Sequence, residues 1–242
     1  MTRTSAPYGL EPFDNCLTCR WRSDEFFCGL EGEALAAFDA ITFTTVYPAS
    51  SILFQEGQKP RGVFMICKGK AKLTTTSANG RTLITHVAEE GEVLGLSSIL
   101  SDVPHKSTAE TLEPSQINFI RRDDFVRFLR EHSDACFKAA QQLAEECESS
   151  DDHVRSLGLS QSAAEKLAHL ILTWCDEHGK DSEDGFRLKM MMTHQEISQM
   201  IGTSRETVTR LLGEFKEKEI ISIKGSTLVV RRRADLAAMV LL

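Results

Sequence analysis

The chain has 242 residues, of which 41% are hydrophobic and 26% are charged, and its formal net charge is −7. This length and composition suit two modest hydrophobic cores. No apolar run approaches the roughly 18 residues that a membrane helix needs, and the N-terminus lacks the basic and then apolar pattern of a secretory signal. These features argue against a membrane or secreted protein and predict a cytoplasmic one. Seven cysteines without a secretory signal favour reduced thiols or metal ligands over a disulfide framework.

Three cysteines lie close together near the N-terminus, at Cys16, Cys19 and Cys28. Thiolates clustered in this way suit an Fe–S cluster or zinc, and both take four ligands. Zinc binding, thiol redox chemistry and the absence of any cofactor are the alternatives to a cluster. The candidates for a fourth ligand are Cys67, Cys136, Cys147, Asp123 and Asp124. For Cys67 and Cys147, the role of an ordinary buried cysteine is favoured over that of a ligand.

Residues from about 41 to 120 contain β-rich runs that alternate with turns rich in Gly, Pro and Asn. Examples are Ile52-Leu53-Phe54, Gly62-Val63-Phe64-Met65-Ile66 and the Asn79-Gly80 turn. Runs of this length bounded by turn residues predict an antiparallel arrangement. We therefore expect a β-roll domain over residues 31–130, preceded by a cysteine-containing segment over residues 1–30.

Two helices are expected next, a short one from Asp123 to about Leu129 and a longer one from about Ser133 to Leu157. In the longer helix, small and apolar residues recur at alternating spacings of 3 and 4. This pattern is typical of a coiled-coil seam and predicts dimerisation through residues 131–158. The seam is weak, and Asp151 would lie close to its symmetry mate, so that like charges oppose association. Dimerisation is then marginal and open to control; a helix that packs only on its own domain is the alternative. The expected dimer residues are Leu143, Cys147, Asp151 and Val154.

A helix-turn-helix is predicted within residues 159–242. Thr193 and Glu196 fit a capping box that begins a short helix, and Gly202-Thr203 permit a tight turn. Ser204 can cap the second helix, whose apolar residues recur at helical spacing: Val208, Leu211, Leu212 and Phe215. Two short β-rich runs, residues 220–223 and 227–230, flank Lys224-Gly225-Ser226 and predict a hairpin. Together these elements predict a winged helix-turn-helix.

The second helix carries polar side chains that can read bases. A guanidinium matches the acceptors of guanine and a carboxylate accepts from cytosine, which makes Arg205, Glu206, Thr209 and Arg210 candidates for base contacts. From Arg187 to Arg233 there are ten Lys and Arg against five Glu, a balance of +5. Basic and capping residues at the ends of these elements suit phosphate contacts, and the candidates are Thr193, Ser204, Lys224 and Arg231. Double-stranded DNA is therefore the expected partner.

The stretch from Met192 to Val230 is similar, nearly position by position, to the DNA-binding domain of the CRP/FNR family of bacterial transcription regulators. Upstream segments such as residues 51–57, 63–69 and 91–95 resemble the family's β-roll sensor. The resemblance implies an α+β fold and a homodimer that binds a palindromic operator, with half-sites near TGTGA or the overlapping TTGAT, and works with RNA polymerase. It implies no enzyme activity. Cyclic AMP is disfavoured, because Leu96 and Lys106 stand where that branch has a Glu and an Arg.

The N-terminal cysteines resemble the oxygen-sensing FNR branch, in which three of them and one from the sensor domain hold a [4Fe–4S] cluster. Asp151 matches an acidic position of that branch's dimer helix. Two departures stand out: the eight-residue gap between Cys19 and Cys28 is longer, and Asn118 occupies the strand position where the fourth cysteine is expected. The rival interpretations are a regulator gated by another effector, such as a small molecule or nitric oxide at haem, and a Cys-x-x-Cys thiol oxidoreductase, which would need a βαβ context.

Overall fold

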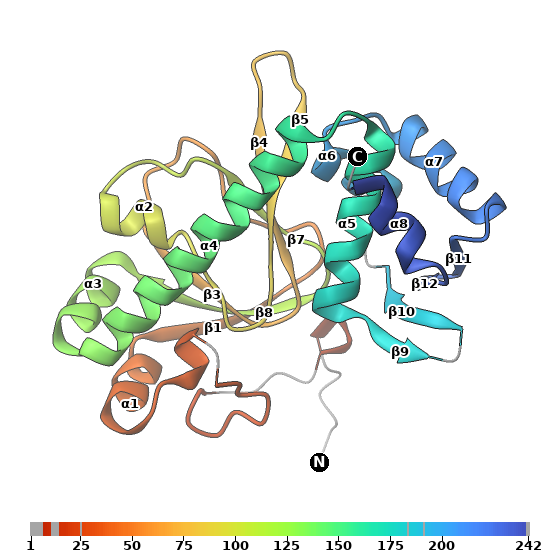
Figure 1. The fold of residues 1–242 in the computed structure, drawn as a ribbon. Helices are drawn as coiled ribbons and strands as arrows, with labels where there is room; N and C mark the ends of the chain where they lie inside the picture. Colours follow the sequence, from red (N-terminus) through yellow and green to blue (C-terminus); the bar gives the residue numbers. More distant parts are fainter. Residues whose placement is uncertain (1–6, 11–14, 25, 183, 191, 241–242) are drawn as a thin grey trace. The chain divides into compact units, whose positions relative to one another are not determined.

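The computed structural model describes residues 7–10, 15–24, 26–182, 184–190 and 192–240. The chain forms two compact units, Met1–Ser150 and Asp151–Leu242. Figure 1 shows the elements of both units along the chain. Together they make an α+β protein, as the sequence predicts.

The first unit is built on antiparallel strands flanked by helices. Its elements in chain order are η1 (Pro7–Gly9), η2 (Phe26–Gly29), α1 (Gly32–Ala40), β1 (Thr42–Tyr47), β2 (Ile52–Phe54), β3 (Gly62–Lys68), β4 (Ala71–Thr76), β5 (Thr82–Ala88), β6 (Val93–Leu94), α2 (Leu96–Ser101), β7 (Thr108–Thr111), β8 (Ser115–Arg121), α3 (Arg122–Glu131) and the long helix α4 (Ser133–Leu159), which continues into the second unit. The strands form two four-stranded sheets, β1-β8-β3-β6 and β2-β7-β4-β5. This arrangement confirms the predicted β-roll and both predicted helices.

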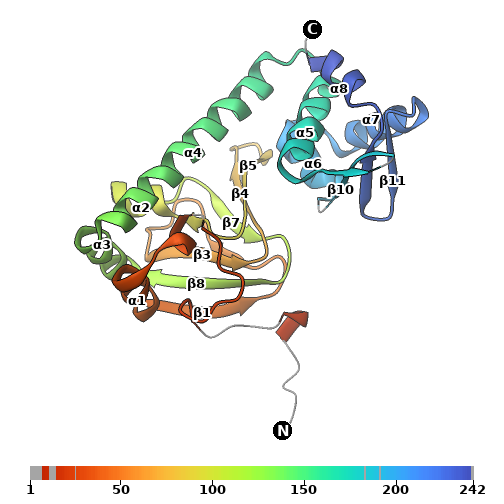
Figure 2. The ribbon, with the colours of Figure 1, turned by 60° about the horizontal axis from the view of Figure 1, so that its bottom comes forward.

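Strand β3 separates two hydrophobic cores, because successive side chains of a strand point to opposite faces. Val63 and Met65 face a core that also contains residues of α1, α2, α3 and the start of α4. Ile66 and Phe64 face the second core, which lies between the two sheets. In Figure 2, α1, α3 and the first half of α4 lie beside the sheet that contains β1, β8 and β3. The first core therefore joins this sheet to the helices.

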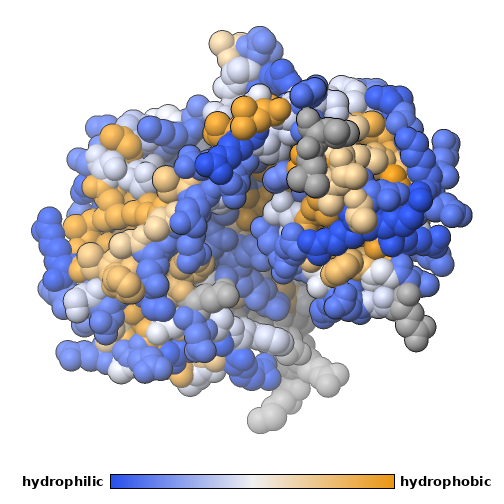
Figure 3. Space-filling view, viewed as in Figure 1, coloured by the Kyte–Doolittle hydropathy of each residue, from blue (hydrophilic) through white to orange (hydrophobic). Residues whose placement is uncertain are grey.

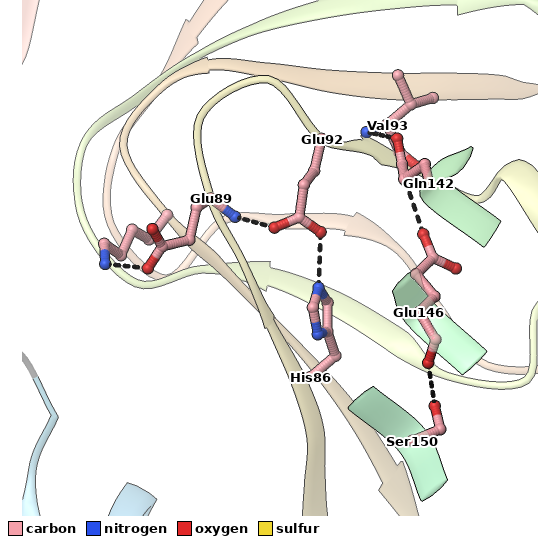
Figure 4. A network of polar contacts seen from close by, with 8 residues as sticks. His86, Glu89, Glu92, Val93, Gln142, Glu146 and Ser150 are labelled. Atoms are coloured by element: carbon pink, nitrogen blue, oxygen red, sulfur yellow. Dashed lines mark hydrogen bonds and ion pairs between the residues drawn. The ribbon is translucent and has the colours of Figure 1, made fainter. Parts of the chain in front are cut away.

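A polar network fixes α4 to the β-roll (Figure 4). The buried amide of Gln142 accepts from the backbone N–H of Val93 at 2.9 Å and donates to the carbonyl of Val93 at 2.9 Å and to Glu146 at 2.6 Å. Next to it, His86 pairs with Glu92 at 2.7 Å. Burial lowers the pKa of His86, but Glu92 and other carboxylates outweigh this effect and raise it. Gln142 thus acts as an added hydrogen-bonding partner for strand β6.

Replacing Gln142 by Ala should destabilise the first unit. The change leaves a buried N–H and a buried C=O of Val93 without partners, which costs on the order of 1–3 kcal/mol. Urea unfolding measures the loss. Gln141→Ala is the matched control, because Gln141 is the exposed neighbour of Gln142 on the same helix. Equal free energies of unfolding for the two variants would contradict this role.

The second unit contains the end of α4 followed by α5 (Ala163–His178), β9 (Lys180–Ser182), β10 (Gly185–Lys189), α6 (His194–Ile201), α7 (Arg205–Glu217), β11 (Ile221–Lys224), β12 (Thr227–Val230) and α8 (Arg233–Val240). The strands pair in the order β11-β12-β10-β9. The helix-turn-helix is α6 and α7, and the predicted hairpin is β11 and β12. The winged helix-turn-helix is confirmed, with a wing extended by β10 and β9.

The local signals in the sequence explain where α6 and α7 begin and end. Thr193 and Glu196 make both hydrogen bonds of the capping box at the start of α6. Gly202 ends the helix with φ of 66°, a conformation that glycine adopts at little cost. The Ser204 side chain accepts from the backbone N–H of Thr207 at the start of α7. Within the described residues, no helix is long and apolar enough to cross a membrane.

Candidate cysteine site and nucleic-acid interface

Four of the seven cysteines line one cavity of the first unit. Cys16, Cys19 and Cys28 come from the N-terminal segment, and Cys67 comes from strand β3. The cavity comprises about 340 Å³ of space that protein atoms do not fill, part of it open to solvent. Its remaining wall is mostly apolar and includes Trp21, Phe27, Leu35 and Met65. The fold therefore brings Cys67 to the three cysteines that the sequence grouped.

Hydrogen bonds hold the cysteine segment in place. The backbone N–H of Cys16 donates to Asp39 of α1 at 2.6 Å. The Arg22 guanidinium donates to the carbonyl of Cys28 at 2.8 Å and also to the carbonyl of Leu30. Cys16 to Cys19 form a turn and do not begin a helix. This placement differs from the helix N-terminus that a Cys-x-x-Cys oxidoreductase uses.

Asn118 contacts the site from the neighbouring strand β8. It is 1% exposed, and its side-chain N–H donates to Cys16 Sγ at 3.4 Å. The Thr44 hydroxyl donates to the Asn118 carbonyl oxygen at 2.7 Å. This second bond orients the amide so that its N–H group faces the sulfur. The residue at the position where the resemblance implies a cysteine is therefore a hydrogen-bond donor to one.

Without a bound cation, burial favours the neutral form of three thiols of the site, Cys16, Cys28 and Cys67. Burial, Asp39 and Cys28 together raise the pKa of the Cys16 thiol to about 12. Burial also raises the pKa of Cys28, and it raises that of Cys67 well above the usual range. Three neighbouring thiols that resist ionisation are poor nucleophiles. Their ionisation would have to be coupled to the arrival of a cation.

A single metal ion and a cluster make different demands on the thiols that bind them. Across the described parts of the chain, no three His, Cys, Asp or Glu side chains are close enough to hold a single metal ion. Zinc needs four ligands around one point, with sulfur at about 2.3 Å. A [4Fe–4S] cluster has a separate iron for each thiolate and so tolerates wider spacing. The four thiols share the wall of one cavity, and none of the described side chains joins two of them in a group of three around a single point.

The other candidate ligands lie elsewhere. Cys136 and Cys147 are exposed on α4. Asp123 is 3.7 Å from Arg122, and Asp124 is 3.5 Å from Arg127, so both carboxylates have cationic partners on α3. None of these four residues lines the cavity. Cys67, for which the sequence favoured an ordinary buried role, is the candidate that does.

The cysteine segment also contacts the helix predicted to dimerise. The Lys138 ammonium donates to the carbonyl of Asp24 at 3.4 Å. Cys16 and Cys28 pack against the core that contains Ala135 and Ala139 of α4. On the same helix, Phe137 is 64% exposed and Val154 is 67% exposed, and Figure 3 shows apolar surface near the first half of α4. The helix thus contacts the cysteine segment and also carries exposed apolar side chains.

Helix α7 presents the predicted base-reading residues on its exposed face. Arg205, Glu206, Thr209 and Arg210 are all exposed. Hydrogen bonds from its own backbone and from Ser204 lower the pKa of Glu206. Arg210 forms an ion pair with Glu214 one turn later. The Thr209 hydroxyl bonds to His194 at 2.8 Å, so that His194, which the sequence did not single out, joins α6 to α7.

The basic residues around the wing divide into two groups. Arg232 pairs with Asp235 at 3.2 Å, and Arg233 pairs with Asp176 and lies over the Phe186 ring. These two arginines stabilise the start of α8. Lys224 lies at the tip of the wing, and Arg231 is exposed after it. Thr193 and Ser204 are exposed at the helix N-termini, where backbone N–H groups attract phosphate.

The positions that correspond to the family's cyclic-nucleotide site carry side chains that differ from those of the cyclic-AMP branch. Leu96 is 1% exposed and belongs to the first core, which leaves no polar group at that position. Lys106 is exposed. Between them His105 stacks on Phe54, with ring centroids 3.9 Å apart. Burial lowers the pKa of His105 and favours its neutral form.

Comparison with known proteins places both units in described families. Residues 44–132 match the cyclic nucleotide-binding domain, and residues 165–239 match the Crp-like helix-turn-helix domain. The chain is 26% identical over 195 residues to the global nitrogen regulator of Synechocystis sp., which covers 79% of this chain and 85% of that protein. It is 23% identical to the CRP-like cAMP-activated global transcriptional regulator of Mycobacterium tuberculosis, over 87% and 94% of the two chains.

Solved structures share the fold. A CooA mutant from Carboxydothermus hydrogenoformans gives a TM-score of 0.77 at 18% identity, over 91% of this chain and 98% of that one. FixK2 from Bradyrhizobium japonicum gives 0.71 at 20% identity, over 82% and 97%. At these identities the likeness extends to the architecture alone.

Proposed function

The chain belongs to the CRP/FNR family of transcription regulators, and we propose that it is a homodimer whose binding to a palindromic DNA operator is controlled by a [4Fe–4S] cluster. The observation that carries this proposal is the cavity around which Cys16, Cys19 and Cys28 converge. Each recognition helix α7 would enter a major groove, with half-sites about one helical turn apart. The cluster, when bound, would supply sensitivity to oxygen.

Contacts of the cysteine segment suggest how the state of the site would control DNA binding. Arg22 and Asp39 hold the cysteine segment, and Lys138 ties that segment to α4. A change in the packing of the cysteine segment would therefore change the packing of the first half of α4. The proposed dimer contacts Leu143, Cys147, Asp151 and Val154 follow on the same helix. Because Asp151 would repel its mate, a small loss of packing would suffice to weaken the dimer.

A cyclic nucleotide is the second candidate effector, favoured by the family match over residues 44–132. The relative from M. tuberculosis is named as cAMP-activated. In this chain the buried Leu96 offers no acceptor for a ribose hydroxyl, and Lys106 offers a point charge where a planar guanidinium would bind phosphate bidentately. We therefore expect cyclic AMP to leave the affinity for DNA unchanged.

Purification without oxygen tests the proposal. The protein should carry iron and sulfide, absorb visible light and bind DNA, and exposure to air should remove all three properties. Cys16→Ser and Cys28→Ser should lack iron, because each removes a ligand from the cavity. Cys136→Ser is the matched control, since Cys136 is an exposed cysteine of the same unit, and it should retain the iron of the wild type.

Three results would count against the proposal. A colourless, metal-free dimer that binds DNA equally well in air would exclude a sensory cluster. Zinc in place of iron and sulfide would favour a structural metal site. An increase in DNA affinity on addition of cyclic AMP would favour the second candidate.

A further inference from the structure

We propose that Cys67 is the fourth protein ligand of the group held by Cys16, Cys19 and Cys28, and that Asn118 donates a hydrogen bond to the Cys16 ligand. This inference rests on the proposed function and assigns the ligand that the sequence left open. In this assignment the fourth ligand lies on strand β3, and Asn118 of the adjacent strand β8 supports the Cys16 ligand as a hydrogen-bond donor.

The register of the sheet places Cys67 at the cavity. Val63 and Met65 face the core beneath the N-terminal segment, and the period of two along a strand puts Cys67 on the same face. The pairing of β3 with β8 is interrupted between Ile66 and Lys68. Such a bulge bends the strand and can redirect a side chain. Cys67 is 8% exposed and lines the cavity together with Met65.

A separate contact ties the N-terminal segment to this part of β3. The Lys68 ammonium lies 4.4 Å from the centroid of the Trp21 ring. Trp21 lies between Cys19 and Cys28, and Lys68 directly follows Cys67. A cation over an indole ring is attracted electrostatically. The segment that carries three cysteines is therefore held against the strand end that carries the fourth.

On β8, Asn118 stands where the resemblance implies a cysteine, and its side chain supports the Cys16 ligand. Thr44 fixes its amide, and the amide N–H group points at Cys16 Sγ. A hydrogen bond to a sulfur stabilises its charged form, and groups of this kind orient and tune metal ligands. Asn118 pairs with Met65 in the sheet, and Met65 lines the cavity together with Cys67.

Anaerobic reconstitution with ferrous iron and sulfide tests the assignment. Cys67→Ala, a change of small volume, should reduce the iron and sulfide retained per chain by about tenfold or more, because loss of merely orienting partners already costs about 10–100-fold in metal affinity. Cys147→Ala, an exposed cysteine outside the cavity, is the control and should retain the wild-type content. The double variant Cys67→Ala with Asn118→Cys places a thiol next to Cys16, where the Asn118 side chain lies, and should regain iron.

Thermal unfolding of the metal-free proteins separates ligand loss from misfolding. We expect metal-free Cys67→Ala to melt close to the metal-free wild type, and the second thiol to restore iron and the visible spectrum. Wild-type iron content in Cys67→Ala would overturn the assignment and leave the proposed function standing, provided that Cys16→Ser is iron-free. Iron loss that Asn118→Cys does not restore would also overturn it. Absence of iron from the reconstituted wild type would instead refute the proposed function.

Discussion

Phe27→Ala should destabilise the first unit more than any other single change at the cysteine site. Phe27 is 1% exposed, and its ring lies 5.5 Å from that of Phe38 and 5.6 Å from that of Phe125. Truncating a buried Phe costs about 3–5 kcal/mol, because apolar contacts are lost and a cavity remains. Since Phe27 also lines the cysteine cavity, the variant should hold iron poorly as well. Urea unfolding of the metal-free protein measures the first effect.

The control for this prediction is Phe43→Ala on strand β1, because Phe43 is 57% exposed. Its free energy of unfolding should stay close to that of the wild type. The metal-free protein is used because a bound group stabilises the folded state and would mix the two effects. If Phe27→Ala unfolds at the same urea concentration as Phe43→Ala, Phe27 does not join the site to the core in the way described.

The DNA-binding unit was predictable because its signals are local. The capping box at Thr193 and Glu196, the turn at Gly202 and the cap at Ser204 each depend on residues within a few positions of one another. Strands β9 and β10 were not predicted. They are short, and β10 is fixed by pairing with β12, some forty residues later. The ion pairs of Arg232 and Arg233 were not predicted either, because their partners Asp235 and Asp176 lie on α8 and α5.

The cysteine site was only half predictable. The grouping of Cys16, Cys19 and Cys28 is visible in the sequence, whereas their meeting with Cys67 depends on the long-range packing of the N-terminal segment on β3. One signal was available: Val63, Met65 and Cys67 alternate with Phe64 and Ile66, which assigns Cys67 to the face opposite the inter-sheet core. The role of Asn118 required the pairing of β8 with β3 and β1. No local pattern contains that information.

Arg205→Ala should weaken binding to the preferred operator and relax the preference at one base pair of each half-site. Arg205 is the exposed first residue of α7, where the N-terminus of a recognition helix meets base edges. A bidentate contact to guanine discriminates by about 1–3 kcal/mol, and a symmetric dimer loses it twice. Selection of binding sites from random DNA, followed by affinity measurements on the selected sites, gives both the preference and the loss.

Two comparisons separate base reading from general attraction to DNA. Lys224→Ala at the wing tip should weaken binding to all sequences alike and lower the slope of log affinity against log salt by about one. Arg210→Ala should cost somewhat less than Arg205→Ala, because Arg210 gives up its ion pair with Glu214 when it contacts a base, and an exposed pair of this spacing is worth about 0.3–0.5 kcal/mol. If Arg205→Ala selects the same operator as the wild type, Arg205 contacts phosphate and the base is read by another residue of α7.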